Sequence, residues 1–94
     1  MKIEFDPAKS ARNARERGLP FSVLEAFDWV TAEYLEDTRF AYPERRMVAI
    51  GYVGERLHFV CFTRRGDVVR IISFRKASRK EIREYEETKA ANRR

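Results

Sequence analysis

The sequence is poor in the residues that build disulfides, metal centres and histidine-based active sites. Its 94 residues include one cysteine, Cys61, and one histidine, His58. Together they exclude a conventional zinc site and leave no Cys–His pair of recognisable spacing. Cys61 lies in the apolar run LHFVCFT, so we interpret it as a small core residue and His58 as a packed or rim-exposed neighbour. The sequence therefore predicts a protein without metal or cofactor.

Long apolar runs and repeats are also missing. No run approaches the ~20 apolar residues of a membrane span, and the N-terminus lacks the pattern of a secretory signal peptide. With 44% hydrophobic and 37% charged residues, the composition is typical of a folded, very soluble domain. The length fits one domain, residues 1–94. We expect it to be cytoplasmic, in a reducing compartment, and without membrane contact.

Positive charge is abundant, mainly in the second half of the chain. The net charge is +5, and residues 48–94 hold twelve basic and six acidic side chains against eight and nine in residues 1–47. Within residues 64–80, seven basic residues accompany a single acid, Asp67. Cations held on strand and helix ends suit a positioned polyanion, which indicates a nucleic-acid partner, although an acidic protein would also fit.

Hydrophobic periodicity and capping residues predict the element order β-α-α-β-β-β-β-α. The expected strands are residues 1–5, 31–35, 46–53, 56–64 and 68–74. The expected helices are residues 7–17, 23–27 and 79–91. Ser22 and Ser78 each precede a glutamate by three residues, Glu25 and Glu81, so both are predicted to start a helix with a capping box.

Short turns at residues 54–55 and 65–67 predict that the last three strands form an antiparallel meander. We therefore expect an α+β domain with a mostly antiparallel sheet of four or five strands. Two N-terminal helices and one C-terminal helix would cover one side of it.

Period-two alternation assigns the arginines of the last two strands to faces of the sheet. It puts Arg70 and Arg75 on opposite faces of the last strand, and Arg64 at the end of the strand before it. Both faces are apolar in the middle, so these arginines are interpreted as rim residues. There a guanidinium can reach a phosphate, or it can snorkel and pair with an acid.

RNA cleavage is compatible with this composition because it does not require histidine. Attack of a 2′-hydroxyl on the adjacent phosphate needs alignment, charge stabilisation and some proton transfer. Arginine and lysine can supply the first two, and tyrosine, glutamate or lysine can supply the third. Composition alone does not separate cleavage of RNA from simple binding.

Three segments, taken in order and spacing, resemble the BrnT family of bacterial type II toxins. They are FDPAKSARNARERG (residues 5–18), DTRFAYPERR (residues 37–46) and TRRGDVVRIISFRKA (residues 63–77), followed by Glu81 and Tyr85. The resemblance implies a RelE-like fold, metal-independent endoribonuclease activity, and growth arrest through inhibited translation. It also implies neutralisation by a cognate BrnA-like antitoxin, with operator DNA contacted only through the toxin–antitoxin complex.

The resemblance and the charge pattern together predict the site. The residues predicted to act in catalysis are Arg64, Arg75, Lys76, Arg79 and Tyr85. The residues predicted to bind RNA are Lys9, Asn13, Arg70, Lys80 and Arg83. Arg64, Arg75 and Arg79 would align the phosphate and stabilise its charge, whereas Lys9, Lys76 and Tyr85 are candidates for proton transfer or base contact.

One departure from the family keeps alternatives open. Relatives often end the first helix with Lys-His-Gly, where this chain has Glu16-Arg17-Gly18, so the residue that transfers protons is not assigned. A non-catalytic basic module that binds nucleic acid or an acidic antitoxin is therefore a second hypothesis. An inactive toxin relic that still binds its antitoxin is a third.

Overall fold

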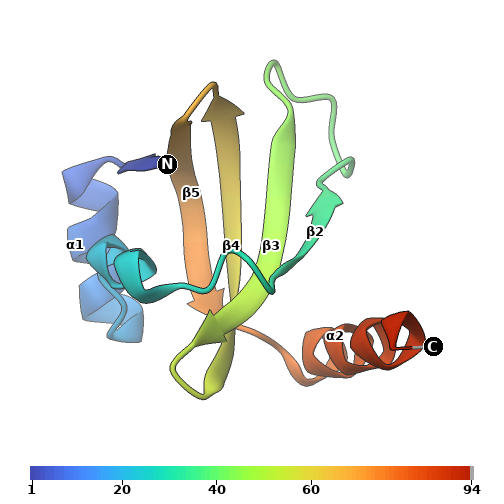
Figure 1. The fold of residues 1–94 in the computed structure, drawn as a ribbon. Helices are drawn as coiled ribbons and strands as arrows, with labels where there is room; N and C mark the ends of the chain where they lie inside the picture. The colour runs from blue at the N-terminus through green and yellow to red at the C-terminus, as the bar shows by residue number, and fades with distance from the viewer. Residues whose placement is uncertain (94) are drawn as a thin grey trace.

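A five-stranded, mostly antiparallel sheet forms the centre of the computed structural model, which describes residues 1–93 (Figure 1). Its strands are β1 (Lys2–Glu4), β2 (Glu33–Glu36), β3 (Arg46–Val53), β4 (Arg56–Arg65) and β5 (Val68–Lys76). They lie in the order β1-β5-β4-β3-β2, and β1 runs parallel to β5 while the other pairs are antiparallel. The predicted α+β fold and its meander are confirmed.

Both α-helices begin at signals that the sequence carries, and α1 also ends at one. Helix α1 (Pro7–Arg17) starts where the Asp6 carboxylate accepts the Ala8 N–H at 2.9 Å, and it ends at Gly18, whose φ is 68°. Helix α2 (Arg79–Asn92) starts with the predicted capping box between Ser78 and Glu81. Within residues 1–93, no helix is long and apolar enough to cross a membrane.

The predicted capping box at Ser22 is wrong. Residues Phe21–Ala26 form a 3₁₀ helix, η1, which has no side-chain cap. The Phe21 N–H instead donates to Ser10 Oγ of α1 at 2.8 Å, so a tertiary contact satisfies the donor. Phe21, Leu24 and Phe27 are all buried, and their spacing of three matches the three residues per turn of a 3₁₀ helix.

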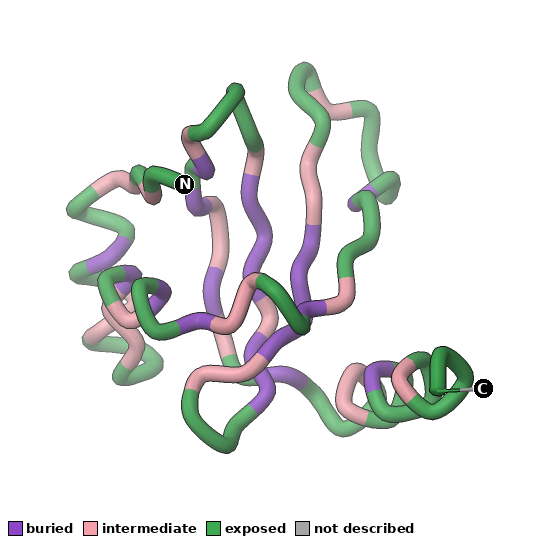
Figure 2. The backbone as a smooth tube through the Cα atoms, viewed as in Figure 1, coloured by how far each residue is buried: buried purple, intermediate pink, exposed green. Residues whose placement is uncertain are grey.

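The helices lie on opposite faces of the sheet, which corrects the expectation that they share one side. One apolar cluster joins η1 to residues such as Val60 and Phe74, and we call this side of the sheet the η1 face. A second cluster joins Tyr85 of α2 to residues such as Ile50 and Cys61, on what we call the α2 face. The central strands carry apolar residues on both faces, so each face needs its own cover, and much of these strands is buried (Figure 2).

A β-bulge in β5 changes which side chains share a face. Cys61 pairs with Ser73 and Phe62 with Ile71, so Ile72 is an extra residue in β5. Beyond it, Phe74 lies on the η1 face, while Arg75 stacks on Phe59 of the α2 face. The predicted alternation is therefore wrong past Ile72, because simple period-two counting does not include a bulge.

Gly51 of β3 lies where the chain after η1 crosses the sheet. A Cβ added there would lie 2.7 Å from Cζ of Phe27 and 3.0 Å from Cβ of Ala32.

We expect Gly51→Ala to lower the free energy of unfolding by about 1–3 kcal/mol, because a buried ring must move. Urea denaturation measures this, and adding Phe27→Leu should make the double variant lose less than the sum of the single losses. Strict additivity would contradict the proposed clash.

Candidate nucleic-acid interface

Four cations come from the end of β5, the start of α2 and the neighbouring start of β4, and we call Arg56, Arg75, Lys76 and Arg79 the junction. Arg56, from the start of β4, donates to the Ala77 carbonyl at 3.4 Å. Arg75 donates to the Lys76 carbonyl at 3.2 Å. The side chains of Arg56, Lys76 and Arg79 are exposed. The positive end of the α2 dipole lies at the same place, so the junction combines full and partial positive charges.

Arg75 is held more firmly than the other junction cations. Its Nη1 and Nη2 donate to the two carboxylate oxygens of Glu81 at 2.8 and 2.9 Å. Its guanidinium carbon lies 3.9 Å from the centre of the Phe59 ring. The hydrogen bond from Arg75 is the main cause that lowers the pKa of Glu81, with a smaller contribution from the backbone of Ser78. The sequence assigned Glu81 to the helix cap, and the structure shows that one carboxylate both caps α2 and orients Arg75.

Arg64 lies far from the junction. It is paired with Val69, six residues along β5 from Arg75, which corresponds to roughly 20 Å. Its Nε donates to the Gly66 carbonyl in the β4–β5 turn at 2.9 Å. Arg64 and Arg75 therefore cannot contact the same phosphate.

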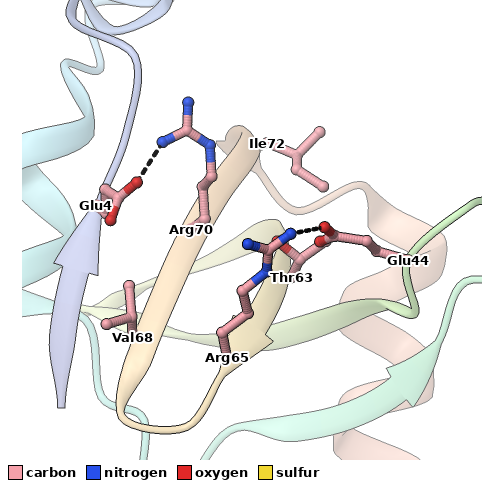
Figure 3. Close-up of a pocket in the computed structure, with 7 residues that line it drawn as sticks. All are labelled: Glu4, Glu44, Thr63, Arg65, Val68, Arg70 and Ile72. Atoms are coloured by element: carbon pink, nitrogen blue, oxygen red, sulfur yellow. Dashed lines mark hydrogen bonds and ion pairs between the residues drawn. The ribbon is translucent and has the colours of Figure 1, made fainter.

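Arg70 lines a separate cleft of about 510 Å³ on the α2 face, at the end of the sheet that holds the β4–β5 turn (Figure 3). Arg70 donates to Glu4 at 2.6 Å, and Arg65 pairs with Glu44 across the same cleft. The charges of both arginines are thus balanced by carboxylates. At the junction Arg75 is likewise paired with Glu81, but among the described residues Arg56, Lys76 and Arg79 form no ion pair, so the junction suits a phosphate better than this cleft does.

Tyr85 and Asn13 are engaged in contacts within the protein. Tyr85 is buried, and its hydroxyl donates to the Thr31 carbonyl at 3.2 Å. Asn13 donates through Nδ2 to the carbonyls of Leu19 and Phe74, at 2.7 and 2.9 Å. These contacts tie α2 to the segment before β2 and the end of α1 to β5.

The remaining predicted site residues lie on the helices. Lys80 and Arg83 are exposed on α2, and Lys80 lies 3.9 Å from Glu84. They extend the positive charge of the junction along the helix. Lys9 is exposed on α1.

His58 is packed, as the sequence indicated. It is 4% exposed, its ring lies 5.4 Å from that of Phe74, and Nδ1 lies 2.8 Å from the Arg56 carbonyl. Burial is the main cause that lowers its pKa, so the ring is neutral at pH 7 and unavailable to substrate. Among residues 1–93, no three His, Cys, Asp or Glu side chains are grouped so that they could hold a metal ion.

Sequence reasoning missed Arg56 and the organisation of the loop between β2 and β3. The predicted pairing of the last two strands could have placed Arg56 beside residue 77. In the loop, the buried Asp37 accepts bonds from Nε and Nη2 of Arg39, each at 2.9 Å, and from the Tyr42 hydroxyl at 3.3 Å. The bonds from Arg39 are the main cause that lowers the pKa of Asp37 to about 2. The loop therefore has a defined shape at neutral pH.

The fold and the junction define a small α+β domain with a cationic strand–helix corner suited to a polyanion. Residues 5–81 match the model of a family described as the ribonuclease toxin BrnT of type II toxin–antitoxin systems, and the chain belongs to this family. The junction lies wholly inside the matched range. The resemblance seen in the sequence is confirmed, and the family implies an antitoxin partner. A comparison with curated proteins found no significant match.

The loop gives a prediction about pH. The folded-state pKa of Asp37 is about 2 and its ordinary value is 3.8, so its stabilising effect is present above pH 4 and is lost as the pH falls toward 2. Asp37→Asn should therefore have a lower Tm than the unmodified protein at pH 7, and the gap should shrink between pH 4 and 2. Circular dichroism melts measure this. Asp67→Asn, at an exposed turn, is the control and should show little effect.

Proposed function

We propose that this protein is a metal-independent endoribonuclease whose active site is the junction. The supporting observation is the group of four cations at the N-terminus of α2, in a chain that belongs to a family of ribonuclease toxins. Cleavage would proceed by attack of a 2′-hydroxyl, which loses its proton, on the adjacent phosphate. The bond from phosphorus to the 5′-oxygen of the next nucleotide breaks, and that oxygen gains a proton, which leaves a 2′,3′-cyclic phosphate and a 5′-hydroxyl. Loss of cellular RNA would then inhibit translation and growth.

The junction would act mainly by stabilising charge. Arg79 and Arg56 would contact the non-bridging phosphate oxygens as negative charge builds on them, together with the first-turn N–H groups of α2. Arg75 is already oriented by Glu81, so it needs little reorganisation when RNA binds. We assign proton transfer to Lys76, the exposed amine of the junction, and we assign Tyr85 the role of holding α2 in place.

Residues outside the junction would guide the RNA strand. Lys80 and Arg83 would contact the phosphates next to the cleaved one, because they follow Arg79 on the same helix. Arg64 and Arg70 would contact nucleotides several positions away, since they lie toward the other end of the sheet. Exposed Lys9 of α1 would form the outermost part of this path, whereas we assign Asn13 the role of holding α1 on β5.

The partner follows from the same surface. We propose that a BrnA-like antitoxin neutralises the toxin by covering the junction with an acidic or amphipathic segment. Operator DNA would then be bound by the antitoxin part of the complex. Growth arrest on expression of the toxin alone, and its relief by the antitoxin, would test this pairing.

Activity can be measured on bulk RNA in EDTA. We expect Arg75→Ala and Arg79→Ala each to lower kcat about 100-fold or more, as the loss of a preorganised donor to transition-state charge does. Arg12→Ala, at an exposed position of α1, removes the same charge elsewhere and should leave kcat unchanged. Circular dichroism checks that each variant is folded.

The results of these cleavage and growth assays distinguish the endoribonuclease from the two other hypotheses. RNA that the unmodified protein retains but does not cleave, with an affinity that falls steeply with salt, would favour the non-catalytic binding module. A folded protein that neither cleaves RNA nor arrests growth would favour the toxin relic.

The distance between Arg64 and the junction gives a second kinetic prediction. We expect Arg64→Ala to raise KM severalfold with little change in kcat, because it removes a phosphate contact that is equal in the ground and transition states. Initial rates over a range of concentrations of a defined oligonucleotide measure both constants. A loss of kcat as large as that of Arg79→Ala would contradict this assignment.

A further inference from the structure

A cleft of about 450 Å³ lies on the α2 face beside the junction. The loop at residues 37–39 and the strand β2 form one wall, and the first two turns of α2 form the other. Arg75 belongs both to the junction and to the lining of this cleft. A group that occupies the cleft would therefore lie next to a phosphate bound at the junction. The volume is within the range of small-molecule sites.

The floor of the cleft is apolar and carries a stacked cation. Val48 and Ile50 are buried in the second apolar cluster, on the α2 face, and the Phe59 ring lies under the Arg75 guanidinium. The Arg75 side chain is 34% exposed, and Glu81 fixes the plane of its guanidinium. Planar guanidinium groups stack on nucleobases as well as on aromatic rings. A base in the cleft would thus extend the stack of Phe59 and Arg75.

The charges around the cleft do not suit a phosphate. Its lining contains three cations and four carboxylates: Arg39, Arg75, Lys80, Glu36, Asp37, Glu81 and Glu84. A neutral group that donates hydrogen bonds fits this rim better than an anion. The cleft and the junction therefore differ in the chemistry that they accept, although they share Arg75.

Glu84 is the carboxylate best placed to bind such a group. Asp37 and Glu81 are engaged by Arg39 and Arg75. Glu84 is 60% exposed, and Lys80 lies 3.9 Å from it, which is longer than a hydrogen bond. Its two oxygens can accept two parallel hydrogen bonds.

Guanine is the base that matches one free carboxylate. Its Watson–Crick edge presents two adjacent donors, N1–H and the exocyclic N2 amino group. Adenine and cytosine present an amino group next to an acceptor, and uracil presents one N–H between two carbonyls. Among the four bases, only guanine can donate to both oxygens of one carboxylate through its Watson–Crick edge, an edge that proteins read in unpaired bases of RNA.

We propose that this cleft binds an unpaired guanine of the RNA, with its ring stacked on Arg75 and its Watson–Crick edge on Glu84. The inference rests on the proposed function, since it names the base next to the phosphate cleaved at the junction. It makes Glu84 a residue that determines specificity. An antitoxin side chain is the competing occupant, and the experiment tells the two apart.

Cleavage of oligonucleotides that differ only at one unpaired position tests the proposal. We expect the unmodified protein to prefer guanine over adenine, cytosine or uracil by about tenfold or more in kcat/KM. Inosine, which lacks the N2 amino group, should be intermediate. Glu84→Gln should reduce the preference to about threefold or less. Glu87→Gln, at an exposed position of the same helix outside the cleft, should keep it.

A second measurement does not depend on activity. In a titration followed by NMR, guanosine monophosphate should shift the amides of Thr38 and Lys80 at lower concentration than adenosine monophosphate does. Glu84→Gln should remove this difference. If the two nucleotides bind equally and the protein still cleaves RNA, the cleft proposal is overturned and the proposed nuclease function stands.

Two further outcomes separate a failure of the proposed function from a failure of the guanine proposal. Selective binding of guanosine monophosphate by a protein that cleaves no RNA would overturn the proposed function and retain the pocket. If Glu84→Gln weakens only neutralisation by the antitoxin, the cleft belongs to the antitoxin interface and the base proposal is wrong.

Discussion

The ion pair between Arg75 and Glu81 is the interaction on which the rest of the site depends. It joins the end of β5 to the first turn of α2. The Glu81 carboxylate also accepts the Ser78 N–H at 2.8 Å. Both side chains are largely shielded, with exposures of 34% and 20%, so losing one partner would leave the other's charge poorly solvated. The start of the helix and the orientation of the central cation are therefore coupled.

The sequence predicted the features that local rules control. The strands β3, β4 and β5 follow from apolar periodicity, their turns from short polar and glycine-containing links, and the start of α2 from Ser78 and Glu81. The buried positions of His58 and Cys61 follow from the apolar run around them. Each of these predictions depends on residues close together in the chain, so no tertiary information was needed.

The features that the sequence did not predict depend on contacts between distant segments. No residue type marks the bulge at Ile72, because its neighbours Ile71 and Ser73 suit either face, yet the bulge moves Arg75 to the α2 face. Clustering of cations in residues 64–80 suggested one site. Arg64, however, lies next to the β4–β5 turn and Arg75 lies near the other end of the extended strand β5, so the two are far apart. Charge density along a chain is a guide to surface chemistry only after strand direction is considered.

The same bulge explains how one cation can serve two kinds of chemistry. Without the extra residue, Arg75 would lie on the η1 face, away from Phe59, Glu81 and the cleft. With it, the guanidinium edge is held by Glu81 at the start of α2, beside the junction, and its plane lies over the Phe59 ring at the floor of a cleft with a carboxylate rim. A phosphate is attracted to the cationic junction and repelled by the carboxylates of the cleft. A base that donates hydrogen bonds is instead favoured in the cleft and disfavoured at the junction. This difference would fix the direction in which a nucleotide binds, because only one orientation satisfies both environments.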